Sequence, residues 1–226
     1  MRRVLLIAPF ALISLVHQIP GQGAGQAPAL PSKPLTLTQV WTLDTTYTDQ
    51  RHGVTFRYPS VWAATTQFAY HPPALTRSDE AKPIAGFGYS EGGFPRDRIV
   101  GPYSRTNLEG VGVVYSAVPV AGAAECEAKA TSLSDTPGHR RAVFGNRSFT
   151  VHETGQAGMS QSIDGSLYAT YAGHTCYLFE TDIAVASPGA LDNIQALTPA
   201  QSRDIENRLL DIMRSVRIVL STRPPG

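Results

Sequence analysis

The sequence predicts a domain of the α+β class, with strands through its middle and helices beside them. From Thr36 onward, Thr, Val, Tyr, Phe and Trp recur at short intervals with Gly and Pro between them, a pattern typical of strands. Two segments break this pattern with apolar residues at helical spacing. The chain has 226 residues, 42% hydrophobic and 16% charged, so it can bury a core and is not expected to be disordered.

The charge of the chain excludes two classes of partner. Its formal net charge is +1, from 19 Lys and Arg against 18 Asp and Glu. A dedicated nucleic-acid-binding protein usually carries a basic stripe, and a polybasic membrane-surface protein carries clustered Lys and Arg. We therefore expect neither a nucleic-acid partner nor a polybasic membrane contact.

The first 27 residues have the three parts of a secretory signal peptide. An arginine pair precedes the apolar run 4–16, which spans only about 20 Å as a helix and falls short of the roughly 30 Å of a bilayer core. A permanent membrane anchor is therefore the weaker interpretation. Small residues at the end of the leader favour cleavage after Ala27, with Ala24 as the alternative site. We expect a secreted or periplasmic protein without a stable membrane anchor.

Behind this leader, the sequence predicts one globular domain. The mature chain carries 17 basic and 18 acidic residues, because the leader removes two arginines and no acids. Three prolines mark residues 28–35 as a semi-rigid linker. Residues 36–221 are predicted to form a single domain, since the part before the Pro-bearing loop His71–Pro83 is too short for a core of its own. Residues 222–226 are expected to be a disordered tail.

Six segments rich in β-branched and aromatic residues are predicted strands. They are Val54–Tyr58, Ala85–Ser90, Gly110–Val118, Arg141–Val151, Ser166–Ala172 and Thr175–Val185. In the last segment, apolar side chains including Tyr177 and Phe179 alternate with Glu180 and Asp182. We expect the apolar face to join the core and the two acids to be solvated on an exposed face.

Two helices and a closing strand complete the prediction. Ala121–Leu133 is rich in Ala and Glu and carries one narrow apolar stripe. The second helix has three start signals, namely a possible N-cap at Thr198, Pro199 at the first helical position, and Gln201 in a capping-box pattern. Its apolar face predicts a surface helix lying on a sheet, and residues 217–220 are predicted to add a closing strand.

The segment Gly53–Trp62 joins an apolar strand, a Pro that ends it and a Trp that can fold back over the same core. It resembles the opening hairpin of the PsbP-like families, and the helix–strand end of the chain resembles the close of the same fold. The two segments cover about a fifth of the chain. The resemblance implies an antiparallel β-sheet flanked by helices in an α/β/α sandwich, in proteins that mostly bind or help assemble partners rather than catalyse. It supplies no catalytic residues, and the two cysteines depart from its pattern.

Cys126 and Cys176 are the only cysteines of the chain. An exported chain meets an oxidising compartment, so a disulfide is the leading interpretation, and two buried free thiols are the alternative. The bridge would close a loop of about 50 residues, worth roughly 4 kcal/mol in loop-closure entropy. A nucleophilic cysteine is disfavoured, because the flanking Glu125 and Glu127 would raise the thiol pKa of Cys126.

No catalytic, cofactor-binding or metal-binding set is predicted. His174 and Glu180 lie about 20 Å apart along an extended strand, too far for one metal ion. The glycines from Gly86 to Gly93 lack the spacing and the following helix of a dinucleotide site. His139–Arg141 with Arg147 is the one basic cluster, which either docks an anion or an acidic partner or guards a strand edge.

The leading prediction is therefore an exported, non-enzymatic domain without a cofactor, which binds a protein partner or a small ligand in the cell envelope or outside the cell. The alternative is a secreted hydrolase with a dispersed site, formed by Ser160, by His152 or His174, and by Asp164. The missing final glycine after Ser160 excludes a nucleophile elbow, yet catalytic groups can converge from distant segments.

Overall fold

The computed structural model describes residues 34–64, 81–91, 101–138, 140–158, 160–187 and 194–220, which all belong to one compact unit spanning residues 31–226. The expected leader, most of the expected linker, the greater part of the His71–Pro83 loop, His139 and the expected tail lie outside the described residues. Within the described part of the chain, no helix is long and apolar enough to cross a membrane.

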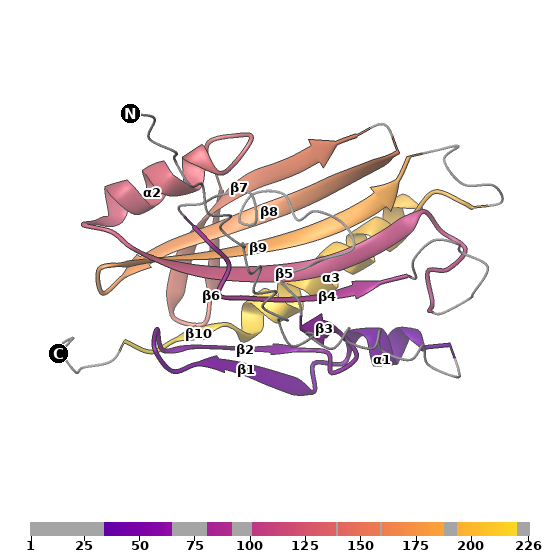
Figure 1. The fold of residues 1–226 in the computed structure, drawn as a ribbon, viewed down its shortest axis with the longest axis horizontal. Helices are drawn as coiled ribbons and strands as arrows, with labels where there is room; N and C mark the ends of the chain where they lie inside the picture. Colours follow the sequence, from indigo (N-terminus) through magenta and orange to yellow (C-terminus); the bar gives the residue numbers. More distant parts are fainter. Residues whose placement is uncertain are drawn as a thin grey trace, which may run out of the picture. The chain divides into compact units, whose positions relative to one another are not determined.

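The described residues form helices and strands in an α+β arrangement (Figure 1). The helices are α1 (Leu37–Trp41), α2 (Ala123–Ser132) and α3 (Pro199–Ser215). The strands are β1 (Thr45–Asp49), β2 (Val54–Tyr58), β3 (Ala63–Ala64), β4 (Ala85–Ser90), β5 (Leu108–Pro119), β6 (Arg140–Phe144), β7 (Arg147–Ala157), β8 (Gln161–Ala172), β9 (Thr175–Ala186) and β10 (Arg217–Ile218).

The strands make two sheets where a single sheet was expected. The larger sheet has the order β3-β4-β5-β9-β8-β7-β6, and every neighbouring pair in it is antiparallel. The smaller sheet has the order β1-β2-β10 and is also antiparallel. The short β10 confirms the predicted closing strand, which pairs with β2 through Ile218 and Val54.

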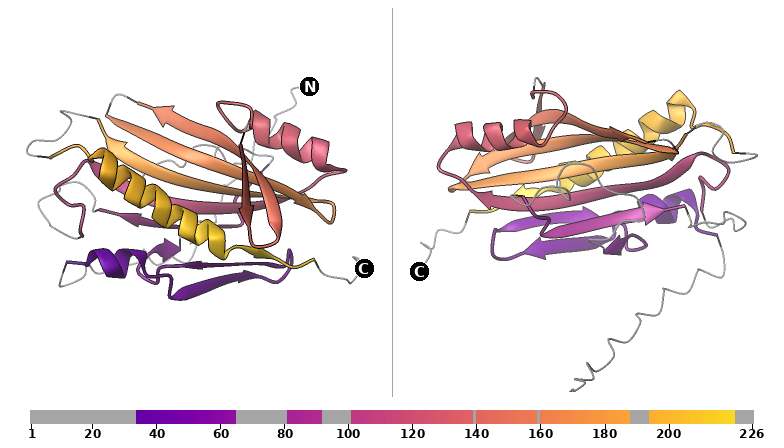
Figure 2. Two further views of the ribbon diagram at one scale, coloured as in Figure 1. Left: turned by 180° about the vertical axis from the view of Figure 1, so that it is seen from behind. Right: turned by 45° about the horizontal axis from the view of Figure 1, so that its top comes forward.

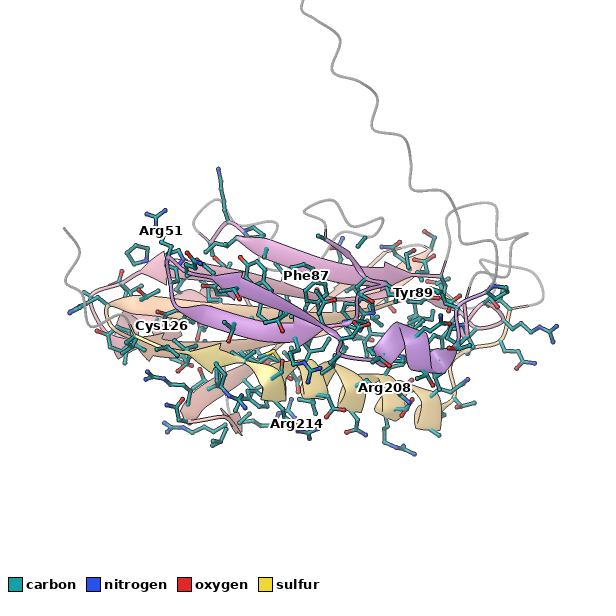
Figure 3. All side chains as sticks on the ribbon, turned by 90° about the horizontal axis from the view of Figure 1, so that it is seen from below. Arg51, Phe87, Tyr89, Cys126, Arg208 and Arg214 are labelled. Carbon is teal, nitrogen blue, oxygen red and sulfur yellow. A yellow bond between two sulfur atoms is a disulfide. The ribbon has the colours of Figure 1, made fainter. Side chains whose placement is uncertain are left out.

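The two sheets share one aromatic core. Phe56 of β2 has its ring centroid 5.7 Å from that of Phe87 in β4, which is labelled in Figure 3, and 6.1 Å from that of Phe179 in β9. Such edge-to-face contacts add about 0.5–1.5 kcal/mol each to the burial of the rings. The predicted apolar face of the Thr175–Val185 segment is therefore confirmed as core.

The two longer helices lie against opposite faces of the large sheet (Figure 2). Helix α3 begins as predicted, because Thr198 Oγ1 accepts from the backbone N–H of Gln201 at 3.2 Å and Gln201 Oε1 accepts from the backbone N–H of Thr198 at 2.9 Å. Its apolar face joins the aromatic core through Ile205, Leu209, Ile212 and Met213. Helix α2 packs on the other face, where it buries Cys126 and Ala130.

Three expectations need correction. The predicted strand Arg141–Val151 is a hairpin of β6 and β7, because Gly145 takes a positive φ of 59° and turns the chain between them. Strand β1 and helix α1 had not been expected. Glu180 and Asp182 are 0% and 1% exposed, so the prediction of two solvated acids is wrong.

Candidate functional site

A cleft of about 550 Å³ lies between α2 and the outer face of β6, β7 and β8. Its volume falls within the range of small-molecule sites. Its walls combine small residues with a few polar ones, and the lining residues are Ala123, Ala124, Cys126, Glu127, Gly138, Arg140, Arg141, Ser148, Thr150, Ala169, Thr170 and Tyr171. We call this site the α2 cleft.

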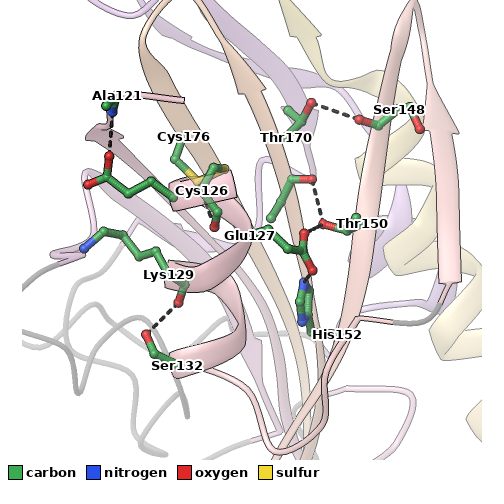
Figure 4. Close-up of a disulfide and its surroundings, with 12 residues drawn as sticks. Ala121, Cys126, Glu127, Lys129, Ser132, Ser148, Thr150, His152, Thr170 and Cys176 are labelled. Carbon is green, nitrogen blue, oxygen red and sulfur yellow. Dashed lines mark hydrogen bonds and ion pairs between the residues drawn. A yellow bond between two sulfur atoms is a disulfide. The ribbon is translucent and has the colours of Figure 1, made fainter. Parts of the chain in front are cut away.

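The disulfide fastens one wall of the α2 cleft to the sheet (Figure 4). Cys126 of α2 and Cys176 of β9 are joined, with their Cα atoms 5.1 Å apart. Both cysteines are buried, in a cluster that also holds Ala130 and Leu178. Because Cys126 and Ala130 are the only buried residues of α2, the disulfide is the main anchor of this helix.

A second attachment comes from Glu127, which reaches from α2 to β7 (Figure 4). Its Oε2 accepts a hydrogen bond from Thr150 Oγ1 at 2.7 Å, and its Oε1 lies 3.3 Å from Nε2 of His152. His152 is fully buried, and Nε2 is not aligned with Oε1 for a hydrogen bond. Gly138 covers the ring so closely that a Cβ there would lie 2.7 Å from Cε1 and Nε2.

His152 also lies near a serine, which raises the question of a catalytic triad. Ser134 Oγ is 3.4 Å from His152 Nδ1, but it also lies 3.1 Å from the carbonyl oxygen of Thr131 and 2.9 Å from that of Thr136. The hydroxyl therefore closes the loop after α2, and its single proton is shared between backbone carbonyls. The ring of His152 is fully buried, and the two hydrogen bonds of Ser134 hold the loop.

The residues predicted for a dispersed hydrolase site do not converge. Ser160 lies in the turn between β7 and β8, whereas His174 lies in the turn at the opposite end of β8. The 12 residues of β8 separate these turns by roughly 40 Å. His152 is buried under Gly138, and Asp164 is exposed on β8. The structure thus assembles no Ser/His/Asp site from these residues.

The predicted basic cluster is divided by the sheet. Arg141 is exposed and lines the α2 cleft, and Arg140 approaches Glu153 at 3.8 Å. Arg147 lies on the other face near Tyr177, whose pKa is raised by burial, while Arg147 acts to lower it. The cleft therefore receives its positive charge from Arg140 and Arg141 and not from Arg147.

The buried acids of β9 were missed by the sequence analysis, although a signal for one of them existed. Asp182 is flanked in the sheet by Gly165 on β8 and by Gly112 on β5. A Cβ on Gly165 would lie 2.6 Å from Asp182 Oδ1 and 2.5 Å from Thr154 Oγ1, so this glycine makes room for the polar groups. Within the described residues, no three His, Cys, Asp or Glu side chains are grouped to hold a metal ion.

Comparison with known proteins assigns no family. No protein-family model and no curated protein matches the chain. Among solved structures, the chain is similar at 9% identity to LpqN, a protein involved in cell envelope biogenesis of Mycobacterium tuberculosis, with a TM-score of 0.41 and coverage of 83% of this chain and 90% of LpqN. It is similar at 8% identity to the Ran-binding protein Mog1p of Saccharomyces cerevisiae, with a TM-score of 0.41 and coverage of 77% and 94%.

The chain is also similar at 9% identity to the cyanobacterial PsbP of Synechocystis sp. PCC 6803, with a TM-score of 0.38 and coverage of 77% of this chain and 92% of that one. Another similar structure comes from Bacteroides thetaiotaomicron, at 8% identity and a TM-score of 0.42. The match covers 80% of this chain but only about half (51%) of the Bacteroides protein. A PsbP structure thus stands among the similar solved structures. At these TM-scores we take no function from any of these proteins.

Proposed function

We propose that this chain is an exported, non-enzymatic binding domain of PsbP-like type that takes a small anionic ligand in the α2 cleft. The proposal includes a signal peptide at residues 1–27, a linker at 28–35, one domain at 36–221 with the α/β/α layering of that family, and a tail at 222–226. The observation that carries the binding role is the cleft itself, a concavity of about 550 Å³ whose wall is anchored before any ligand arrives. A preformed site binds more tightly because less chain has to be ordered on binding.

Two features support export. The leader pattern is that of a secretory signal peptide. The disulfide between Cys126 and Cys176 fits an oxidising compartment, since such bonds are rare in reducing cytosol. Together they support a secreted or periplasmic location.

The charges of the cleft support an anionic ligand. The carboxylate of Glu127 is engaged by Thr150 and lies beside His152, so its charge is directed toward β7. The guanidinium of Arg141 is exposed at the other wall and has no partner among the described residues. Because a guanidinium binds carboxylates and phosphates in bidentate geometry, it suits an anionic group of the ligand.

An NMR titration with benzoate, phenyl phosphate and the neutral benzyl alcohol tests the proposal on the purified protein. We expect the two anions to shift the amide signals of Ser148, Thr150 and Tyr171, and benzyl alcohol to bind at least about tenfold more weakly, because it lacks the charge that pairs with Arg141. Arg141→Ala should abolish this preference. The matched control is Arg203→Ala on the exposed side of α3.

A second pair of variants tests the location. Ala124→Trp adds bulk inside the α2 cleft, whereas Ala128→Trp adds the same bulk to an exposed position of α2 that does not line it. Binding should be lost only in the first. Binding that survives Ala124→Trp, or no binding of either anion, would refute the proposed site.

A further inference from the structure

The outer half of β7 has an unpaired edge, and this edge is a second candidate interaction surface, distinct from the α2 cleft. Strand β6 pairs with β7 only from Arg147 to Val151, because β6 begins at Arg140 opposite Val151. Strand β7 continues to Ala157 and is paired there with β8 on its other side. From residue 153 onward, the large sheet therefore ends at β7 within the described part of the chain.

The main-chain groups of this edge point outward at alternate residues. The backbone N–H of Asp135 donates to the carbonyl oxygen of Glu153 at 3.0 Å, so the carbonyl of Glu153 points away from β8. In an antiparallel sheet this direction repeats every second residue. Gly155 and Ala157 consequently direct their N–H and C=O groups to the open edge, where the described residues supply no partner strand.

A groove of about 650 Å³ runs beside this edge, between β7, the start of β6 and α3. Three of its lining side chains, Ala142, Ile183 and Leu210, are partly buried apolar groups at the margin of the core. Because alternate side chains of a strand point to the same face, a strand added to β7 would direct every second side chain to the face of the sheet that holds this groove, beside Gly155 and Asp164.

The charges around the groove select the chemistry of the added strand. Its lining includes the carboxylates of Asp135, Glu153, Asp164 and Glu206 against the guanidinium groups of Arg140 and Arg141, and Arg140 is already close to Glu153. A Cβ on Gly155 would lie 3.4 Å from Asp135 Oδ2 and 4.0 Å from Asp164 Oδ1, so two carboxylates flank the middle of the edge. This arrangement suits a cationic side chain.

We propose that the β7 edge at Gly155 and Ala157 binds a short extended segment of a partner protein, with basic side chains among the alternate residues that face the groove, as an added antiparallel or parallel strand. Main-chain hydrogen bonds to Gly155 and Ala157 hold the segment, and the carboxylates of Asp135 and Asp164 select the basic side chains that face the groove. Arg140 and Arg141 line both the α2 cleft and this groove, but Gly155 lines only the groove, so each proposal is tested with a probe of its own.

The probe is the acetylated and amidated peptide Thr-Val-Lys-Val-Arg-Val-Thr, titrated into the purified full domain. We expect the backbone amides of Gly155 and Ala157 to exchange rapidly with solvent in the free protein and to become protected on binding. A peptide with Glu in place of Lys and Arg should bind at least about tenfold more weakly, since it meets two carboxylates. A peptide with N-methylated alternate amides should also lose binding, which tests the main-chain bonds without altering the protein.

Protein variants test the same edge. Ala157→Pro removes an edge N–H without breaking a bond to β8, and should weaken the peptide about tenfold. The double variant Asp135→Asn with Asp164→Asn should remove the preference for the basic peptide over the acidic one. The control is Asp204→Asn with Asp211→Asn, which removes the same charge from α3 outside the groove.

Three outcomes would overturn the proposal. The first is equal binding of the basic and acidic peptides, or binding that Ala157→Pro leaves unchanged. The second is slow exchange of the Gly155 and Ala157 amides in the free monomer, which would mean that this chain already covers the edge. The third is a dimer in sedimentation that Ala157→Pro dissociates, which would make a second copy the occupant.

Discussion

Reducing the bond between Cys126 and Cys176 should destabilise the domain strongly and loosen α2 first. The bond links residues 50 apart in the sequence. Closing a loop of that length removes about 14 cal/mol/K of entropy from the unfolded chain, or about 4 kcal/mol at 25 °C. For a domain of this size, 4 kcal/mol corresponds to a fall in Tm of about 8–16 °C.

Reduction should also loosen helix α2 more than the rest of the domain. Helix α2 buries only Cys126 and Ala130, whereas α3 buries four side chains in the aromatic core. Once the bond is cut, α2 retains Ala130 and the contacts of Glu127, so its amides should exchange much faster than those of α3. Helix α3 thus serves as the internal control within one sample.

The assay compares equilibrium urea unfolding of the oxidised and the reduced protein, followed by mass spectrometry without reductant. The double variant Cys126→Ala with Cys176→Ala is the control, because reductant should leave its stability unchanged. A loss below about 1 kcal/mol on reduction would refute the loop-entropy reasoning. Two free thiols in the exported protein would refute the disulfide itself.

Two further predictions concern the part-buried carboxylate of Asp49 and the packing around the buried His152. Burial pushes the pKa of Asp49 upward, but the hydrogen bonds from the side chain and backbone of His52 outweigh it and hold this pKa below its usual 3.8. The carboxylate should therefore stabilise the fold above about pH 4 and lose this contribution as the pH falls through the lowered pKa, so Asp49→Asn should be less stable than wild type to urea at neutral pH and match it only in acid. Gly138→Ala should lower the free energy of unfolding by about 1–3 kcal/mol in the same assay, because its Cβ would overlap the buried ring of His152. The control is Gly122→Ser, which has open space at its Cβ and should change stability by less than about 0.5 kcal/mol. Equal effects of the two variants would contradict the packing argument.

Local signals in the sequence were sufficient for much of the fold. The capping box at Thr198 predicted the start of α3 to the residue, because the signals for this start lie within four residues of one another. The strands β2 and β4 also have their predicted bounds, since alternation of side chains is a local property. The leader pattern at residues 1–27 is equally local, and it stays a prediction because these residues lie outside the described part of the chain.

The arrangement of the candidate site depended on tertiary contacts. The acids of β9 are buried because neighbouring strands place glycines beside Asp182, a relation between residues far apart in sequence. The contacts of Glu127 with Thr150 and His152 exist only because α2 is tied across the sheet. The open edge of β7 likewise follows from where β6 begins to pair, which no local pattern encodes.

The sequence by itself determined the α+β class, the helices that flank the strands, and the two cysteines available to pair. Only the tertiary structure decided that the strands form two sheets, that the basic cluster is divided between two faces, and that the serine and histidines of a possible hydrolase lie apart. The physical reason is that hydrogen bonding and side-chain alternation act over a few residues, whereas a cleft or a free edge is made by strands that meet only after the chain has folded.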